Sequence, residues 1–224
     1  MISILTGLRT GVEFLSQCAA SIEAQTHRDW EWLVGVNGFR PNSAVYRHAL
    51  SMADGDRVRV FDYGRAGPRP AIMHELLAEA RGDLIAVLDA DDLWAPTKLE
   101  RQLAENDWDV IGTWGRYTGD AEGTIPSNQA AELTLDAMLE ENALIHSSSL
   151  MRRECCQWPV TDLLDDYPLW LSLLEQGKRL RNVPEVLTTI RVHPGQHYAG
   201  NRDNSAAIRE EFRARRGEKQ CESP

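Results

Sequence analysis

The feature of the sequence that most constrains the fold is a short apolar run that ends in acidic residues. Residues 84–88 read Leu-Ile-Ala-Val-Leu, and Asp89, Asp91 and Asp92 follow directly. An unbroken apolar run of this length is typical of a strand buried on both faces, as in parallel sheets. Ligands of open α/β sheets bind beyond the carboxyl ends of such strands. Crowded ionised carboxylates repel one another unless a cation or solvent intervenes, so the stretch predicts a divalent metal site at a sheet edge.

The same acidic residues have a purely structural alternative. Asp is favoured around a helix start and Pro at the first helical position, so Asp91 and Asp92 are also explained as caps of a helix that begins near Pro96. The pattern Asp-x-Asp is short and common. Taken by itself it therefore favours capping, and the metal site has to be supported by the rest of the chain.

The composition is that of one acidic α/β domain in a reducing compartment. A chain of 224 residues can bury a sizeable core without disulfides. Its net charge of -10 argues against nucleic acid as a partner. The four cysteines form no C-x-x-C pair and have no His spacing typical of zinc. Since the sequence also lacks a signal-peptide pattern and a membrane span, we expect a cytoplasmic protein, with docking to a membrane surface left open.

The first half of the chain alternates between predicted strands and predicted helices. We expect strands over 2–5, 30–36, 58–61, 84–88 and 110–114, and helices over 12–24, 42–53, 71–80 and 98–105. This alternation predicts a Rossmann-like, mostly parallel sheet flanked by helices, as in nucleotide-binding domains. Right-handed crossovers place the loops after the strands on the same edge as Asp89. Farther along, we expect a strand over 144–151 and a helix over 206–215.

A second acidic cluster, Asp165 and Asp166, precedes a predicted helix. Pro168 is tolerated in the first turn of a helix, so the helix starts close to it and buries the face that contains Trp170. The positive end of the helix dipole keeps both carboxylates ionised near neutral pH. An ionised, fixed carboxylate is suited to act as a general base for a hydroxyl group. Helix capping is the alternative for this pair as well.

Three further polar segments are candidates for the site. Arg69 precedes the helix over 71–80, whose N-terminus is suited to bind an anion such as a diphosphate. His146 lies in the predicted strand over 144–151, and His193 follows a predicted strand and precedes a Pro-Gly turn. His193 and His197 also suggest a zinc pair, but the turn between them prevents a helix from setting their spacing.

Four patches, in this order, resemble glycosyltransferases of family 2, which have the GT-A fold. They are the first strand with Gln25-Thr26, the run from Leu88 to Trp94, His146-Ser147-Ser148 ahead of Arg152, and the segment from Asp165 to Leu173. The resemblance covers most of the chain. It implies one GT-A domain over residues 1–200, with a nucleotide-binding half over 1–114 and a mixed acceptor-binding half over 115–200. Residues 201–224 then form a C-terminal helix and tail.

The sequence departs from the family pattern in three places. The family commonly has an Asp pair after the second strand, where this chain has Val36-Asn37-Gly38-Phe39. An Asn side chain both donates and accepts hydrogen bonds, so the base preference is open. The turn after the first strand is Thr6-Gly7-Leu8-Arg9 in place of a Pro-Thr-Tyr-Asn-like turn, and Asp165 stands where the family usually has Glu.

The resemblance implies an inverting transfer of a sugar from a UDP-, GDP- or dTDP-sugar to a hydroxyl of a glycan or another acceptor. Mn2+ or Mg2+ is the implied cofactor, and Asp166 is the implied general base. The implied roles of the other residues are as follows: Asp91 and His193 hold the metal; Thr6, Arg9, Asn37, Arg69, Asp89, Ala90 and Asp91 bind the nucleotide sugar; His146, Trp170 and Asp165 lie on the acceptor side.

Two other functional classes use similar residues. A nucleotidyltransferase on a similar sheet needs the metal carboxylates but not an ionised base at Asp166, and it releases pyrophosphate. A non-catalytic protein that binds sugar nucleotides is the second alternative. A glycosyltransferase releases a nucleoside diphosphate, so analysis of the products separates these classes.

Overall fold

The computed structural model describes residues 1–64, 67–125, 131–159, 166–195 and 204–221, and all structural statements below concern these residues. The strands are β1 (Ile2–Leu8), β2 (Trp30–Val36), β3 (Val58–Asp62), β4 (Leu84–Val87), β5 (Leu93–Trp94), β6 (Val110–Gly119), β7 (Gly123–Thr124), β8 (Glu132–Leu133), β9 (Leu150–Arg152) and β10 (Leu180–Val192). The α-helices are α1 (Leu15–Glu23), α2 (Ala44–Leu50), α3 (Arg69–Glu79), α4 (Lys98–Leu103), α5 (Leu135–Glu140), α6 (Asp166–Glu175) and α7 (Asn204–Cys221). Three short 3-10 helices are η1 (Val12–Phe14), η2 (His146–Ser148) and η3 (Arg153–Cys155).

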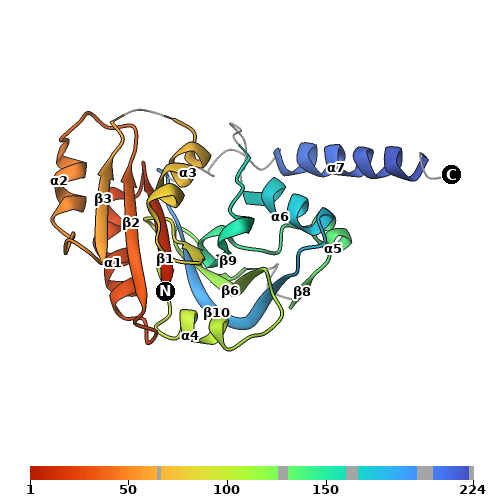
Figure 1. The fold of residues 1–224 in the computed structure, drawn as a ribbon, viewed down its shortest axis with the longest axis horizontal. Helices are drawn as coiled ribbons and strands as arrows, with labels where there is room; N and C mark the ends of the chain where they lie inside the picture. Colours follow the sequence, from red (N-terminus) through yellow and green to blue (C-terminus); the bar gives the residue numbers. More distant parts are fainter. Residues whose placement is uncertain (65–66, 126–130, 160–165, 196–203, 222–224) are drawn as a thin grey trace.

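The sheet is mixed but mostly parallel, as the alternating pattern predicts. Its strand order is β3-β2-β1-β4-β9-β6-β10-β5, and the short strands β7 and β8 pair with β6 and β10 (Figure 1). The first four strands in this order are parallel, β9 is antiparallel to both neighbours, and β10 is parallel to β6. Strands β1, β2, β3, β4, β6 and β10 therefore all end at the same edge of the sheet. The pairing of β10 with β6 shifts register twice, on either side of Val186.

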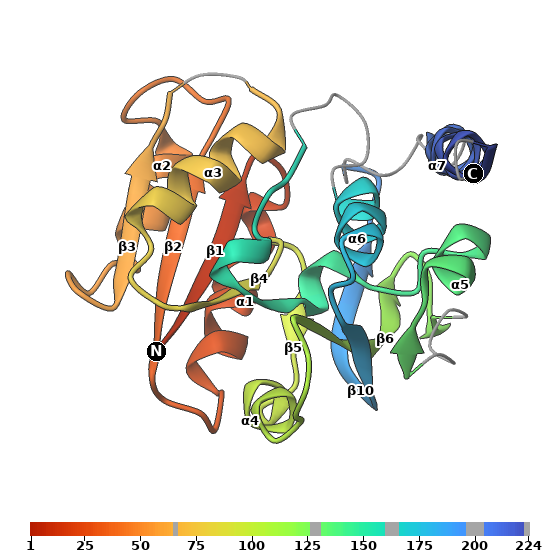
Figure 2. The ribbon, with the colours of Figure 1, turned by 45° about the vertical axis from the view of Figure 1, so that its right-hand side comes forward.

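Two hydrophobic clusters cover the two faces of the sheet. Alternate residues of the strands point to opposite faces, so neighbours such as Ile4 and Leu5 belong to different clusters. Helices α3, α5 and α6 pack on one face, where α7 adds to the cluster by packing on α5 and α6, and α1, α2 and α4 pack on the other face. In Figure 2, α3 and α6 lie in front of the sheet. No described helix has both the length and the apolar character needed to cross a lipid bilayer.

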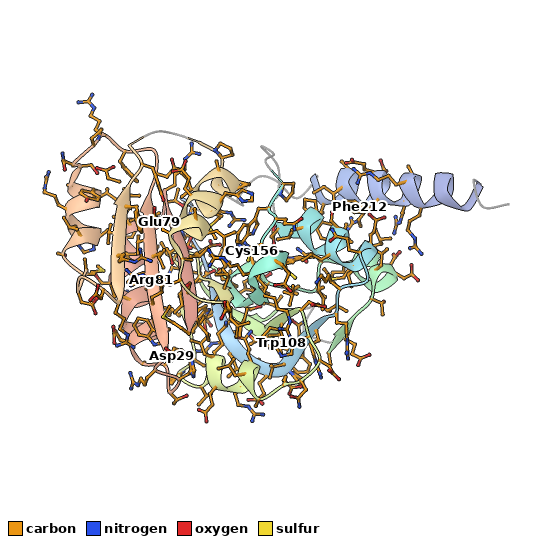
Figure 3. The ribbon with its side chains drawn as sticks, viewed as in Figure 1. Asp29, Glu79, Arg81, Trp108, Cys156 and Phe212 are labelled. Atoms are coloured by element: carbon orange, nitrogen blue, oxygen red, sulfur yellow. The ribbon has the colours of Figure 1, made fainter. Side chains whose placement is uncertain are left out.

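The C-terminal part of the structure differs from the sequence prediction in two elements. The segment over 144–151 is not one strand, because η2 occupies His146–Ser148 and β9 begins only at Leu150. The last helix is longer than the predicted 206–215, since α7 extends from Asn204 to Cys221. It buries Ile208 and Phe212 against the cluster of α5 and α6, and its distal end extends beyond them (Figures 1 and 3).

A buried carboxylate ties the first three strands to the end of α3. Oε1 of Glu31 accepts hydrogen bonds from Oγ of Ser3 and from the backbone N–H of Arg81, each at 2.6 Å. Its Oε2 is 2.8 Å from Nη2 of Arg59. Glu79 and Arg81 are labelled at this junction in Figure 3. Burial alone would raise the pKa of Glu31, but the hydrogen bonds from Ser3, Arg81 and Arg59 outweigh it and lower the pKa.

We predict that Glu31→Gln destabilises the fold at neutral pH by about 1–3 kcal/mol, because a neutral amide cannot accept all three hydrogen bonds. The pKa of Glu31 is below its ordinary value of 4.5 in the folded state, so the stabilisation is present above pH 4.5 and is lost as the pH falls through the folded-state pKa. The free energy of unfolding in urea should therefore differ between the natural protein and Glu31→Gln at pH 7, and this difference should become smaller as the pH is lowered to 3. Glu23→Gln is the matched control, because Glu23 is exposed and its ion pair with Arg57 is long, with 3.8 Å between Oε2 of Glu23 and Nη1 of Arg57. If the difference in unfolding free energy between Glu31→Gln and the natural protein did not change with pH, this explanation would be wrong.

Candidate functional site

The sheet topology brings the predicted site residues to one edge. Asp89 follows β4, Asn37 follows β2, Arg9 follows β1 and His193 follows β10, and these four strands are parallel. Strand β9 runs the opposite way, so His146, which precedes it, lies at the same edge. Helix α6 leads through a short turn into β10 and so runs antiparallel to it. The N-terminus of α6 therefore also faces this edge (Figure 2).

Asp91 and His193 form a direct pair at this edge. Nε2 of His193 is 2.9 Å from Oδ2 of Asp91, and the two side chains are only 10% and 16% exposed. The pKa of Asp91 is raised, chiefly by burial and then by the charge of Asp89, while the contact with His193 acts in the opposite direction. The two residues are far apart in sequence, so the pair exists only because β4 and β10 end together.

Asp89 is held by two basic side chains. Nη1 of Arg69 lies 3.1 Å from its Oδ2, and Nδ1 of His146 lies 4.0 Å from the same oxygen. Nε2 of His146 accepts a hydrogen bond from the indole N–H of Trp158, so in the neutral imidazole the proton is on Nδ1 and faces Asp89. Burial acts to raise the pKa of Asp89, but Arg69 and then His146 lower it well below its usual range. Asp89 is therefore a fixed anion.

Asp92 is the most deeply buried of the three carboxylates. It is 4% exposed, and its Oδ1 accepts the backbone N–H of Arg191 at 2.9 Å. Burial, followed by the charges of Asp91 and Asp89, raises the pKa of Asp92 well above its usual range. The loop after β4 thus concentrates negative charge in a region of low dielectric, and an added positive charge at Asp91 would be strongly favoured.

The donor atoms fit Mn2+ or Mg2+ bound through few protein ligands. No cluster of three or more His, Cys, Asp or Glu side chains that could hold a metal occurs in the described part of the chain. A carboxylate and an imidazole are present in the pair of Asp91 and His193. Mg2+ keeps several waters and is commonly held by one or two carboxylates together with substrate phosphates, and imidazole is a common ligand of transition metals. The pair therefore suits a cation whose coordination shell is completed by a phosphate ligand.

The loop that carries these carboxylates is supported from inside the protein. The backbone N–H of Asp89 donates to Oγ of Ser147, and the indole N–H of Trp94 donates to the carbonyl oxygen of Ser147 at 2.6 Å. The fully buried amine of Lys98 lies 3.8 Å from the centre of the Trp94 ring and donates to Oε1 of Gln102. Burial lowers the pKa of Lys98 well below its usual value. Both ends of the acidic segment are thus fixed to η2 and α4.

The residues predicted for the nucleoside side have different placements. Nη1 of Arg9 and Nδ2 of Asn37 both donate to the carbonyl oxygen of Gly67, at 3.3 and 3.1 Å. Asn37 is 3% exposed, and its Oδ1 has no hydrogen-bond partner among the described residues. Thr6 is fully buried, and its hydroxyl binds the carbonyl oxygen of Leu88 and the indole of Trp32. Because the Thr6 side chain does not reach the surface, the expectation that it lines the pocket is corrected to a structural role between β1 and β4.

The acceptor-side predictions are only partly placed by the structure. Trp170 is 0% exposed, because its ring packs in the core and lies 6.2 Å from the His146 ring; the expectation that it contacts an acceptor is therefore wrong. His146 lies beside Asp89 rather than apart from it. Asp166 is the first residue of α6 and is 9% exposed. Asp165 and His197 lie outside the described residues.

Three residues at the site were not identified from the sequence. Arg191 donates its Nε–H to the carbonyl oxygen of Asp91 and places its guanidinium over the ring of Phe14. Gly11 has a φ of +69°, and a Cβ built there would lie 2.9 Å from Cβ of Asp91, so glycine is required both for the turn and for the close approach. The Thr10-Gly11 turn ahead of the first helix was the available signal. Nothing in the sequence marked Phe14.

Comparisons with known proteins identify relatives of this chain. A model of the family described as glycosyl transferase family 2 matches residues 8–158. The Escherichia coli UDP-Glc:alpha-D-GlcNAc-diphosphoundecaprenol beta-1,3-glucosyltransferase WfaP is 31% identical over 138 residues, which cover 59% of this chain and 53% of WfaP.

Two solved structures share the fold. Staphylococcus aureus TarS in complex with UDP-GlcNAc superposes with a TM-score of 0.77 at 12% identity, covering 95% of this chain and 65% of that one. The mannosyltransferase PcManGT from Pyrobaculum calidifontis, in complex with GDP-Man and Mn2+, gives a TM-score of 0.66 at 16% identity, with coverages of 88% and 59%. The chain thus spans between about half and two thirds of the length of these three proteins.

The predicted GT-A fold is confirmed by these structures, and the predicted enzyme class is confirmed by the family model. With more than half of its residues matched by that model, the chain belongs to glycosyl transferase family 2.

Proposed function

We propose that this protein transfers a sugar from a nucleoside diphosphate sugar to a hydroxyl acceptor, with inversion at the anomeric carbon. The observation that supports the proposal is the topology: the Asp91–His193 pair and the N-terminus of α6, which contains Asp166, are at the same edge of the sheet. The fold shared with TarS bound to UDP-GlcNAc and with PcManGT bound to GDP-Man supports a nucleotide sugar as the donor. In this proposal residues 1–114 bind the donor and residues 115–200 bind the acceptor.

The donor diphosphate would lie against Asp91, His193 and Arg69. A divalent cation held by Asp91 and His193, Mn2+ or Mg2+, would neutralise the charge that develops on the leaving diphosphate. Arg69, at the N-terminus of α3, lies 3.1 Å from Asp89 and so stands next to the same anion site. Asp89, kept ionised by Arg69 and His146, is suited to accept hydrogen bonds from the ribose hydroxyls.

The nucleoside would occupy the space beside Asn37. Its buried Oδ1 is an acceptor without a partner among the described residues, and it suits a ring N–H of uracil, thymine or guanine. Arg9, tied to the same carbonyl oxygen as Asn37, would close the pocket on its outer side. The backbone of Ala90, between Asp89 and Asp91, would lie beside the bond that joins the sugar to the diphosphate.

Asp166 would remove the proton from the attacking hydroxyl. It lies in the first turn of α6, where the helix dipole favours an ionised carboxylate. A general base of this kind contributes about 10²–10⁴-fold to the rate of the catalysed reaction. His146 and Asp165 remain proposed neighbours of the acceptor, and the cytoplasmic location remains a prediction.

We predict that Asp166→Asn lowers kcat for sugar transfer by about 10²–10⁴-fold, because the amide cannot accept the proton, while donor binding is retained. The measurement is steady-state transfer, together with calorimetric binding of the donor. Glu175→Gln is the matched control, as Glu175 is the acidic residue at the opposite end of the same helix. Unchanged turnover in Asp166→Asn with intact donor binding would exclude the assigned role.

We also predict that the protein hydrolyses one member of a panel of UDP-, GDP- and dTDP-sugars slowly with Mn2+ present, and that excess EDTA abolishes this activity. The expected product is a nucleoside diphosphate, identified by chromatography. Replacing Asp91 with Asn should raise the Mn2+ concentration needed for half-maximal rate by at least about tenfold, since a charged ligand is lost. Release of pyrophosphate would instead indicate a nucleotidyltransferase, and donor binding without any turnover, with every acceptor tried, would indicate a binding protein.

A further inference from the structure

His193 lies just beyond the point where the sheet fixes the chain. The pairing of β10 with β6 ends at Val192 and Gly119, and Pro194 and Gly195 follow His193. The imidazole is nevertheless directed at Asp91, with Nε2 2.9 Å from Oδ2. A side chain at a strand end can adopt several rotamers, so contacts with the imidazole ring have to select this one.

Phe14 makes such a contact. Its ring meets the His193 ring in an edge-to-face arrangement, with 5.1 Å between centroids and 64° between planes. This separation and angle are within the range preferred by aromatic pairs, whose interaction depends on orientation as well as on area. The contact therefore restricts the plane of the imidazole and not only its position.

Phe14 is in turn fixed by residues that also bind the acidic loop. The guanidinium carbon of Arg191 lies 4.2 Å from the centre of the Phe14 ring, a cation–π contact. The Nε–H of the same Arg191 donates to the carbonyl oxygen of Asp91 at 3.1 Å. Gly11, three residues before Phe14, lets the turn approach the Asp91 side chain closely. One short segment, Gly11–Phe14, thus contacts both members of the Asp91–His193 pair.

Core packing does not explain this aromatic residue. Its neighbours Val12 and Leu15 pack in the hydrophobic cluster on the α1 face of the sheet, whereas Phe14 is half-buried and belongs to neither cluster. Its ring contacts the imidazole of His193 and the guanidinium of Arg191. Its position is accordingly better explained by the site than by the stability of the fold.

We propose that Phe14 is a positioning residue, whose ring sets the orientation of the His193 imidazole for binding of a divalent cation. The inference rests on the proposed function, because it takes Asp91 and His193 as cation ligands. Groups that orient a metal ligand typically contribute about 10–100-fold to metal affinity. The aromatic ring, rather than the volume of the side chain, is the required property.

The test is the dissociation constant for Mn2+ alone, measured by electron paramagnetic resonance without donor or acceptor. We expect Phe14→Leu and Phe14→Met to weaken Mn2+ binding by about tenfold or more, and Phe14→Tyr to stay within about twofold of the natural protein. Thermal unfolding without metal checks that each variant is folded. Using two non-aromatic variants keeps the test decisive if one of them fails to fold.

Phe61→Leu is the matched control. Phe61 is also half-buried and lies under an arginine, with the guanidinium carbon of Arg59 5.7 Å from its ring, but it is on β3. The Phe61→Leu variant should leave the Mn2+ affinity unchanged.

The variants Asp91→Asn and His193→Ala test the cation site itself. If these two variants lose Mn2+ and the non-aromatic Phe14 variants do not, or if Phe14→Tyr is as weak as Phe14→Leu, the role of the Phe14 ring is refuted and the metal site stands. If Mn2+ does not bind, or binds equally without Asp91 and His193, the proposed metal site fails and the role of Phe14 fails with it.

Discussion

The structure depends on how the charges of three neighbouring carboxylates are accommodated at the end of one buried strand. Asp89, Asp91 and Asp92 share a loop with little access to solvent, and each has a different partner. Arg69 pairs with Asp89 and His146 lies beside it, His193 contacts Asp91, and a backbone N–H donates to Asp92. The charge of Asp89 is compensated by Arg69, whereas burial and the neighbouring carboxylates keep the pKa of both Asp91 and Asp92 above the usual range. Asp91 is 16% exposed and Asp92 only 4%, so Asp91 is the one of these two carboxylates that an added cation can reach.

The same loop depends on segments from the whole length of the chain. Gly11 and Phe14 come from the first turn of the chain, Ser147 from η2 and Arg191 from the last strand. Trp94, stacked on the buried amine of Lys98, fixes the end of the loop from within. The groups proposed as ligands are thus held by a second layer of packed and hydrogen-bonded residues, as preorganised sites require.

The fold was largely predictable from the sequence because apolar runs and helical periods specify the elements, and the handedness of the crossovers specifies the edge. Strand β4 covers residues 84–87 of the predicted strand over 84–88, and Asp89, Asn37 and His193 lie at the predicted edge. What could not be predicted depends on side-chain direction. Thr6 follows an alternation that turns it into the core. The burial of Trp170 is predicted by the helical period, and only its implied contact with an acceptor conflicts with the structure. The contact of Phe14 with His193 joins residues distant in sequence, and no local pattern reports such a contact.

The two register shifts in β10 have a consequence for how such a site tolerates change. Side chains alternate between the faces of a strand, so adding or removing one residue between Val186 and Val192 would exchange the faces of every residue up to the strand end. His193 and the backbone N–H of Arg191 would then both turn away from the acidic loop. The bulges around Val186 therefore determine which face of the sheet each side chain at the far end of the strand points to. Length variation among proteins with this architecture is therefore expected before these bulges or after His193, and not between them.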